Sequence, residues 1–149
     1  MKQVLIAVVL IAVGSVLAHL YVVSQTYHPV VRINSTDGLV FTAVQDPTPE
    51  RRECGAANER FLRPIKTTCP SCKIELARCE RELEPFERSV YEGKALSHYQ
   101  VFATGLRLAI AGPARAAKES CEMMAGQLVK LGVRSAVCLS PRPEMQKAH

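Results

Sequence analysis

The chain has 149 residues, with 19 Lys and Arg against 14 Asp and Glu, so its formal net charge is +5 at pH 7. It contains six cysteines, no tryptophan and only 5% aromatic residues. Single-stranded nucleic acid is bound by basic grooves interleaved with aromatic side chains, and the sequence has no such stripe. The composition therefore argues against a nucleic-acid partner.

An uncharged apolar run at residues 4–23 matches the roughly 20 residues that a membrane-spanning helix needs. Lys2 precedes this run, and no Lys or Arg follows it before Arg32. The positive-inside rule then leaves residues 1–3 in the cytoplasm and places the rest of the chain outside. The sequence predicts a single-pass protein of the inner membrane or, if the run is a signal peptide cleaved near Ala18, a secreted or periplasmic domain.

One domain is expected after the apolar run, because about 125 residues suit one domain better than two. Residues 24–29 read as a linker, residues 30–140 as an extracytoplasmic α+β domain, and residues 141–149 as a basic flexible tail. Gly14 and Ala18 form a small-xxx-small pair, which predicts one way for two copies to pack as a homodimer.

Two β-hairpins are predicted from local patterns. Residues 30–33 and 39–44 are apolar runs on either side of a turn that ends in Asp37-Gly38, which is a strong hairpin signal. Residues 99–103 and 106–111 flank a second turn at Thr104-Gly105 in the same way.

A helical hairpin with cysteines is predicted between the two β-hairpins, over about residues 49–91. Thr48 and Pro49 suit the start of a helix, which we expect to close before Pro64. Thr68 is expected to cap a second helix, which continues until Pro85 kinks or ends it. The charged faces of these helices are expected to be solvated surface.

The C-terminal part predicts an amphipathic helix followed by a strand. The helix starts at Gly112-Pro113 and ends at Gly132, which would be a left-handed cap, and a strand follows at residues 133–139. The whole domain is therefore predicted to be α+β, with the order ββ-αα-ββ-α-β. The helix is expected to turn one apolar stripe to the core, made of Ala117, Cys121, Met124, Leu128 and Leu131.

All six cysteines follow the apolar run, so export to an oxidising compartment predicts disulfides. A continuous helix would hold Cys72 and Cys79 about 10 Å apart along its axis, too far for a disulfide. An antiparallel helical hairpin instead brings Cys54 opposite Cys79. The predicted pairs are Cys54–Cys79, Cys69–Cys72 and Cys121–Cys138.

The Cys69-Pro70-Ser71-Cys72 motif leaves two alternatives open. The motif resembles the C-P-x-C of thioredoxin-like and glutaredoxin-like proteins, in which a helix N-terminus stabilises the first thiolate, so catalytic roles for Cys69 and Cys72 in disulfide exchange are one alternative. The other alternative is a structural zinc site made by Cys54, Cys69, Cys72 and Cys79. Structural disulfides are the preferred interpretation, with no catalytic residue, metal or cofactor.

Residues 106–139 resemble the second half of the SPOR repeat, a small envelope domain that binds peptidoglycan glycan strands. The matching residues are Arg107, Gly112, Pro113, Ala117, Leu128, Gly132, Ala136 and Val137. The resemblance implies glycan binding. From Gly93 to the C-terminus there are eight basic and three acidic residues, which agrees with an anionic ligand. The candidate binding residues are Arg107, Arg115, Lys118, Lys130 and Arg134.

Two functions follow as hypotheses from the sequence. The preferred one is a membrane-anchored envelope protein whose exported domain is a non-enzymatic binding or accessory module. Its partner would be a protein of an envelope-assembly system or a peptidoglycan-like anionic glycan. The alternative is a membrane-tethered thiol–disulfide oxidoreductase that uses Cys69 and Cys72.

Overall fold

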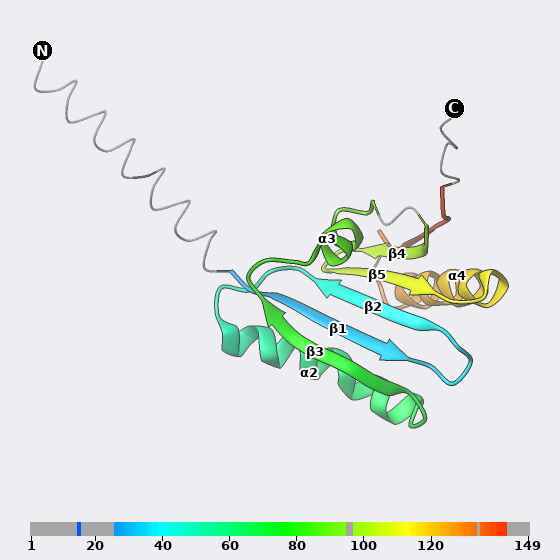
Figure 1. Cartoon of the computed structure of the whole chain (residues 1–149), viewed down its shortest axis with the longest axis horizontal. Helices are drawn as coiled ribbons and strands as arrows, with labels where there is room; N and C mark the ends of the chain where they lie inside the picture. The colour runs from blue at the N-terminus through cyan, green and yellow to red at the C-terminus, as the bar shows by residue number, and fades with distance from the viewer. Residues whose placement is uncertain (1–14, 16–25, 95–96, 134, 143–149) are drawn as a thin grey trace, which may run out of the picture.

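The computed structural model describes residue 15 and residues 26–94, 97–133 and 135–142. Within the described part of residues 26–142, the chain forms a six-stranded sheet and three helices (Figure 1). In chain order these elements are β1 (His28–Asn34), β2 (Val40–Gln45), α2 (Arg51–Thr68), β3 (Lys73–Glu80), α3 (Pro85–Tyr91), β4 (Tyr99–Ala103), β5 (Leu106–Ala111), α4 (Ala114–Lys130) and β6 (Val137–Leu139). All neighbouring strands are antiparallel, and their order across the sheet is β3-β1-β2-β5-β4-β6.

The two halves of the sheet repeat one connectivity. β1, β2, α2 and β3 follow each other as hairpin, helix and strand, and β4, β5, α4 and β6 do the same. In each half the first strand lies in the middle and the last strand lies at the outer edge of the sheet. β2 and β5 meet at the centre, so the two halves are related as if by a twofold axis between them.

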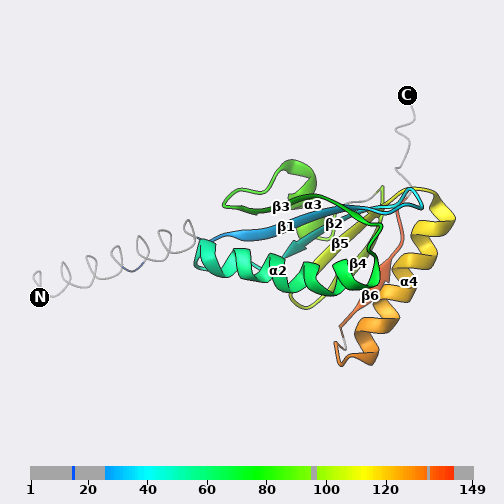
Figure 2. The same ribbon diagram turned by 90° about the horizontal axis from the view of Figure 1, so that it is seen from below.

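Two apolar cores lie on opposite faces of the sheet. α2 and α4 cover one face, as Figure 2 shows, and their buried side chains pack on Val31, Ile33, Leu108 and Ile110. α3 covers the other face, where Val90 packs among the alternate strand residues. Successive strand residues point to opposite faces, so the same strands supply both cores.

Both predicted β-hairpins are confirmed. β1 pairs with β2 from Val30↔Val44 to Asn34↔Val40, and Gly38 adopts a positive φ of 77° in the turn between them. β4 pairs with β5 around Thr104 and Gly105, where Gly105 has a φ of 80°. The turns form where glycine can adopt a backbone conformation that other residues disfavour.

The predicted helical hairpin is wrong, and so is the predicted element order. The segment Lys73–Glu80, expected in the second helix, is strand β3, and it pairs with β1 along its length. Residues such as Glu, Leu, Ala and Arg favour a helix locally, but propensity is a weak prior that tertiary contacts override. Here β1 is buried on both faces, and β3 satisfies the main-chain groups on its outer side. The observed order is ββαβαββαβ.

One helix end also differs from the prediction. Pro64 does not end α2, because it is exposed and the helix continues to Thr68, whose hydroxyl donates to the Pro64 carbonyl. The end of α4 agrees with the prediction: the helix runs to Lys130, and Gly132 follows as a left-handed cap with a φ of 93°, where the Val133 N–H donates to the Leu128 carbonyl.

The prediction that Leu131 belongs to the core is wrong, because this residue is 80% exposed. Ala125, which was not predicted, is a buried residue of α4. The final strand β6 is also shorter than the predicted 133–139.

The membrane-spanning helix predicted at residues 4–23 lies outside the described residues, apart from Ser15. Among the helices that the structure does describe, none is long and apolar enough to cross a bilayer. The N-terminal residues 1–3 and most of the predicted tail, residues 143–149, also lie outside the description.

Candidate functional site

The five basic residues predicted to bind an anion do not form one surface. Arg107 lies on β5 between Leu106 and Leu108, which face α4, so its side chain points to the α3 face. Arg115 and Lys118 lie on α4, on the other side of the sheet, and Lys130 lies in the last turn of that helix. Arg134 lies outside the described residues.

The contacts of these cations are mostly internal. The Arg107 guanidinium lies 4.0 Å from the Phe102 ring centroid and donates to the Ala103 carbonyl, so it packs on its own sheet. Arg115 pairs with Glu119 at 2.9 Å and Lys118 with Glu122 at 3.8 Å, each one turn along α4. Neighbouring carboxylates therefore offset the positive charge of α4.

Three disulfides join Cys54 to Cys79, Cys69 to Cys72 and Cys121 to Cys138. They are the pairs expected from the sequence, although the reason for the first pair differs. Cys79 lies on β3 instead of a second helix, and the disulfide ties this strand to α2. The third disulfide ties α4 to β6 in the same way, so each half of the sheet has one bond between its helix and its outer strand.

The C-x-x-C motif lies at the end of a helix, which corrects the expectation that it starts one. Cys69 is the C-cap of α2, its N–H donates to the Ile65 carbonyl, and β3 begins directly after Cys72. A helix C-terminus carries a partial negative charge, so it destabilises a thiolate. The structure therefore lacks the electrostatic feature on which the oxidoreductase hypothesis depended.

The four cysteines of the alternative zinc site are all bonded in disulfides, Cys54 to Cys79 and Cys69 to Cys72. Zinc binds thiolates, so this set of ligands is not available in the oxidised chain. Across the described residues, no cluster of three or more His, Cys, Asp or Glu side chains is arranged to hold a metal ion.

A groove of about 700 Å³ lies between α2 and α4, with the central strands as its floor. We call it the α2–α4 groove. Only two charged residues, Arg60 and Asp37, line it. Its floor includes Phe41, Leu106 and Leu108, and its walls are largely apolar, with Phe61, Ile65, Met123, Met124, Leu128 and Leu131. Met123 is 55% exposed, so the groove presents apolar surface to solvent.

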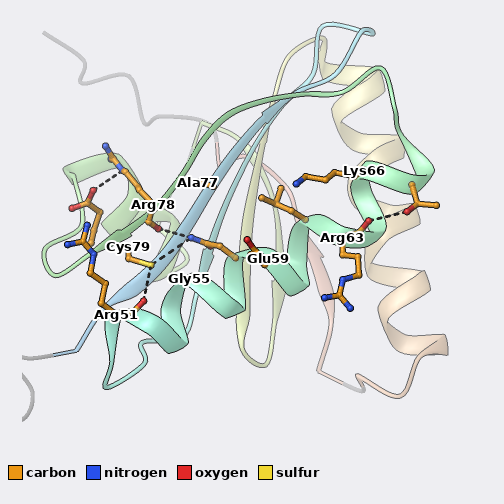
Figure 3. Close-up of a pocket in the computed structure, with 12 residues that line it drawn as sticks. Arg51, Gly55, Glu59, Arg63, Lys66, Ala77, Arg78 and Cys79 are labelled. Carbon is orange, nitrogen blue, oxygen red and sulfur yellow. Dashed lines mark hydrogen bonds and ion pairs between the residues drawn. The ribbon is translucent and has the colours of Figure 1, made fainter.

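A second groove, of about 710 Å³, lies between α2 and the outer strand β3 (Figure 3). We call it the α2–β3 groove. Gly55 and Ala77 are the small residues on its two walls, and Lys66 extends from α2 toward β3. Asn58 crosses between the walls, because its Nδ2 donates to the Arg78 carbonyl at 2.9 Å. Arg51 and Arg63 also line it.

Neither groove was predicted from the sequence. Each is formed by elements far apart in the chain, and the expected second helix hid the strand that makes one wall of the α2–β3 groove. The local sequence signal for the α2–α4 groove was the pair Met123 and Met124 on α4, because methionines are flexible apolar residues typical of adaptable binding surfaces.

No family model, curated protein or solved structure matches the chain. The resemblance of residues 106–139 to a SPOR repeat stays a prediction.

Proposed function

We propose that the chain is an exported, non-enzymatic binding module that holds an apolar helical segment of a partner protein in the α2–α4 groove. The observation that carries the proposal is the apolar lining of this groove, which is open to solvent. Soluble domains rarely expose a continuous apolar surface of this kind unless it binds something. A helix that lays its apolar face into such a groove is a recurrent mode of recognition.

The lining favours a protein segment over a glycan. A glycan presents hydroxyl and carboxylate groups, which need hydrogen-bond partners when they lose water. Arg60 and Asp37 are the charged residues of the lining, whereas Met123, Met124 and Leu128 offer adaptable apolar contacts. The walls run for about ten residues on each helix, or about 15 Å, which suits two or three turns of a bound helix.

The position of the groove favours a protein segment over a lipid chain. β1 starts at His28, soon after the apolar run 4–23 in the sequence, and runs about 20 Å to Asn34. The groove is lined by Ile33, Ser35 and Asp37, so it lies at the far end of that strand. If residues 4–23 hold the chain at a membrane, the length of β1 separates the start of the domain from the groove, which favours a partner outside the bilayer.

Three disulfides support an oxidising compartment for this domain, since such bonds persist mainly in exported proteins. The apolar run that precedes the domain supplies the export signal in this proposal, whether it stays as an anchor at the inner membrane or is removed.

The test uses the full chain in nanodiscs and an amphipathic helical peptide that carries one tryptophan on its apolar face. The chain contains no tryptophan, so the emission of the peptide reports its own environment. We expect a saturable blue shift on binding. Met123→Lys should weaken binding at least tenfold, because it places a charge in the groove.

Val129→Lys is the matched control, because Val129 is on the same helix, 47% exposed and outside the lining. It should leave the dissociation constant within twofold of the unmodified chain. Equal effects of the two substitutions, or no saturable shift, would overturn the proposal.

A further inference from the structure

We infer that the α2–β3 groove is a second binding site, which takes an acidic peptide in an extended conformation. This groove lies on the opposite flank of α2 from the α2–α4 groove, because Arg51, Gly55 and Arg63 line the former and Phe61, Pro64 and Ile65 line the latter. The two sites can therefore be occupied and tested independently.

The walls of the α2–β3 groove are held at a fixed separation. The Cys54–Cys79 disulfide joins α2 to β3, with 6.0 Å between the two Cα atoms. Asn58 is buried, and it links the Arg78 carbonyl of β3 to the Gln45 side chain of β2. A site whose walls are already in place loses less conformational freedom when a ligand binds.

Small residues leave room between these walls. Gly55 lies in the second turn of α2, and a Cβ atom added there would meet no heavy atom within 4 Å. Ala77 lines the groove from the strand side (Figure 3). Glycine inside a helix is less stable than alanine would be. At Gly55 this less stable choice leaves open space on the side of α2 that faces the groove.

Three of the four cations that line the groove form no salt bridge within the described part of the chain. Arg51, Arg63 and Lys66 line it, and within the described residues none of the three forms a salt bridge. Glu59 and Glu80 contribute two opposite charges to the lining, and Glu80 is already paired with Arg78. Arg78 is different, because Glu80, Glu84 and Glu87 all pair with it. The groove therefore has an excess of free positive charge, whereas the cations Arg115 and Lys118 of α4 are paired.

The spacing of these cations selects an extended ligand. Arg51 and Lys66 are fifteen residues apart on α2, which is about 22 Å along the helix axis. An extended peptide covers this distance with about seven residues. β3 is the outermost strand on this side of the sheet, so an extended chain can lie along its outer edge, as in strand addition to other sheets.

The experiment measures fluorescence anisotropy of a labelled, amidated peptide, Glu-Ala-Ser-Ala-Ser-Glu-Glu, with the full chain in phosphatidylcholine nanodiscs. We expect saturable binding that weakens as salt rises, because exposed charges are screened. Lys66→Glu should raise the dissociation constant at least fivefold. Arg52→Glu is the matched control, because it makes the same change in net charge on α2 and Arg52 does not line the groove.

A second pair of substitutions tests the space instead of the charge. Gly55→Leu should fill the groove and reduce binding at least fivefold, whereas Ala56→Leu, on the outer side of the same turn, should not. Circular dichroism of each variant confirms that it is folded. The inference is overturned if the peptide does not bind, or if Arg52→Glu weakens binding as much as Lys66→Glu does. Hyaluronan oligosaccharides serve as an anionic glycan for comparison, and the inference is also overturned if they bind at this site and the peptide does not.

Discussion

Arg78 of β3 and Glu87 of α3 form an ion pair, with 2.6 Å between Nη2 and Oε1, in which the Glu87 side chain is fully buried. Glu87 also accepts a hydrogen bond from the Glu84 N–H, which completes a capping box at the start of α3. Hydrogen bonds to Glu84 and Glu87 raise the pKa of the Arg78 guanidinium above its ordinary value. One carboxylate therefore fixes the short helix α3 to the outer strand of the sheet.

Glu87→Ala is expected to lower the free energy of unfolding by about 3 kcal/mol. Removal of one partner from a buried pair typically costs 3–5 kcal/mol, and the lower end applies because Arg78 keeps two other carboxylates and is partly exposed. Urea unfolding of the full chain in mild detergent, followed by circular dichroism, measures the change. Glu75→Ala, at an exposed position on β3, the strand that carries Arg78, should change the free energy of unfolding by less than about 0.5 kcal/mol. Similar losses of stability in both variants would contradict the stabilising role of the buried Arg78–Glu87 ion pair.

Stability is expected to fall as pH drops below about 6.5, because of His28. Burial lowers the pKa of His28, and a hydrogen bond to the Gln45 main chain and the nearby Asp46 only partly offset this effect. The unfolded chain therefore binds a proton at a higher pH than the folded chain does, so unfolding becomes more favourable as pH falls through this range.

The measurement compares urea unfolding of the full chain at pH 7.5 and pH 5.5. His28→Phe preserves an edge contact with Tyr91, whose ring centroid lies 5.0 Å from that of His28, and it removes the titrating group. The variant should lose less stability than the unmodified chain between the two pH values. An unchanged pH dependence would show that another group is responsible.

The three disulfides are expected to differ in their contribution to stability according to the loop that each closes. Their sequence separations are 25 for Cys54–Cys79, 17 for Cys121–Cys138 and 3 for Cys69–Cys72. Loop-closure entropy assigns them about 3.5, 3 and 2 kcal/mol. Pairwise replacement by alanine, followed by urea unfolding, tests the order, and a larger loss from the Cys69–Cys72 pair than from the other two would contradict it.

Cys69 is expected to be an ordinary thiol when it is free. In a Cys72→Ser variant, its position at the C-terminal end of α2 should make alkylation by iodoacetamide at pH 7 no faster than that of glutathione. Insulin reduction by the unmodified chain should likewise stay at the background rate. Alkylation more than tenfold faster than glutathione would restore the oxidoreductase hypothesis.

Much of the local structure could be predicted from the sequence. The strands around Asp37-Gly38 and Thr104-Gly105 follow from alternating side chains and turn glycines, and the end of α4 follows from Gly132. These signals act within a few residues, so no tertiary contact is needed to recognise them. The cysteine pairs were also predicted, although Cys54–Cys79 was expected from a helical hairpin that the structure replaces with helix α2 and strand β3.

The identity of β3 depended on contacts that the local sequence does not contain. Residues 73–80 have helical propensity, and they form a strand because β1, about 45 residues earlier, needs a partner on its outer side. The repeated connectivity of the two halves was hidden by the same error, because a helix at this position breaks the match with β6.

The sequence by itself determined the hairpins, the amphipathic helix α4 and the set of disulfide-forming cysteines, because turn residues, periodicity and composition are local properties. Only the tertiary structure decided which surfaces are grooves. It separated Arg107 from the cations of α4, placed Cys69 at the end of a helix and set α2 between two grooves of different character. The physical reason is that a groove is made by side chains from elements distant in the chain, and their separation is fixed by sheet order and by disulfides such as Cys54–Cys79.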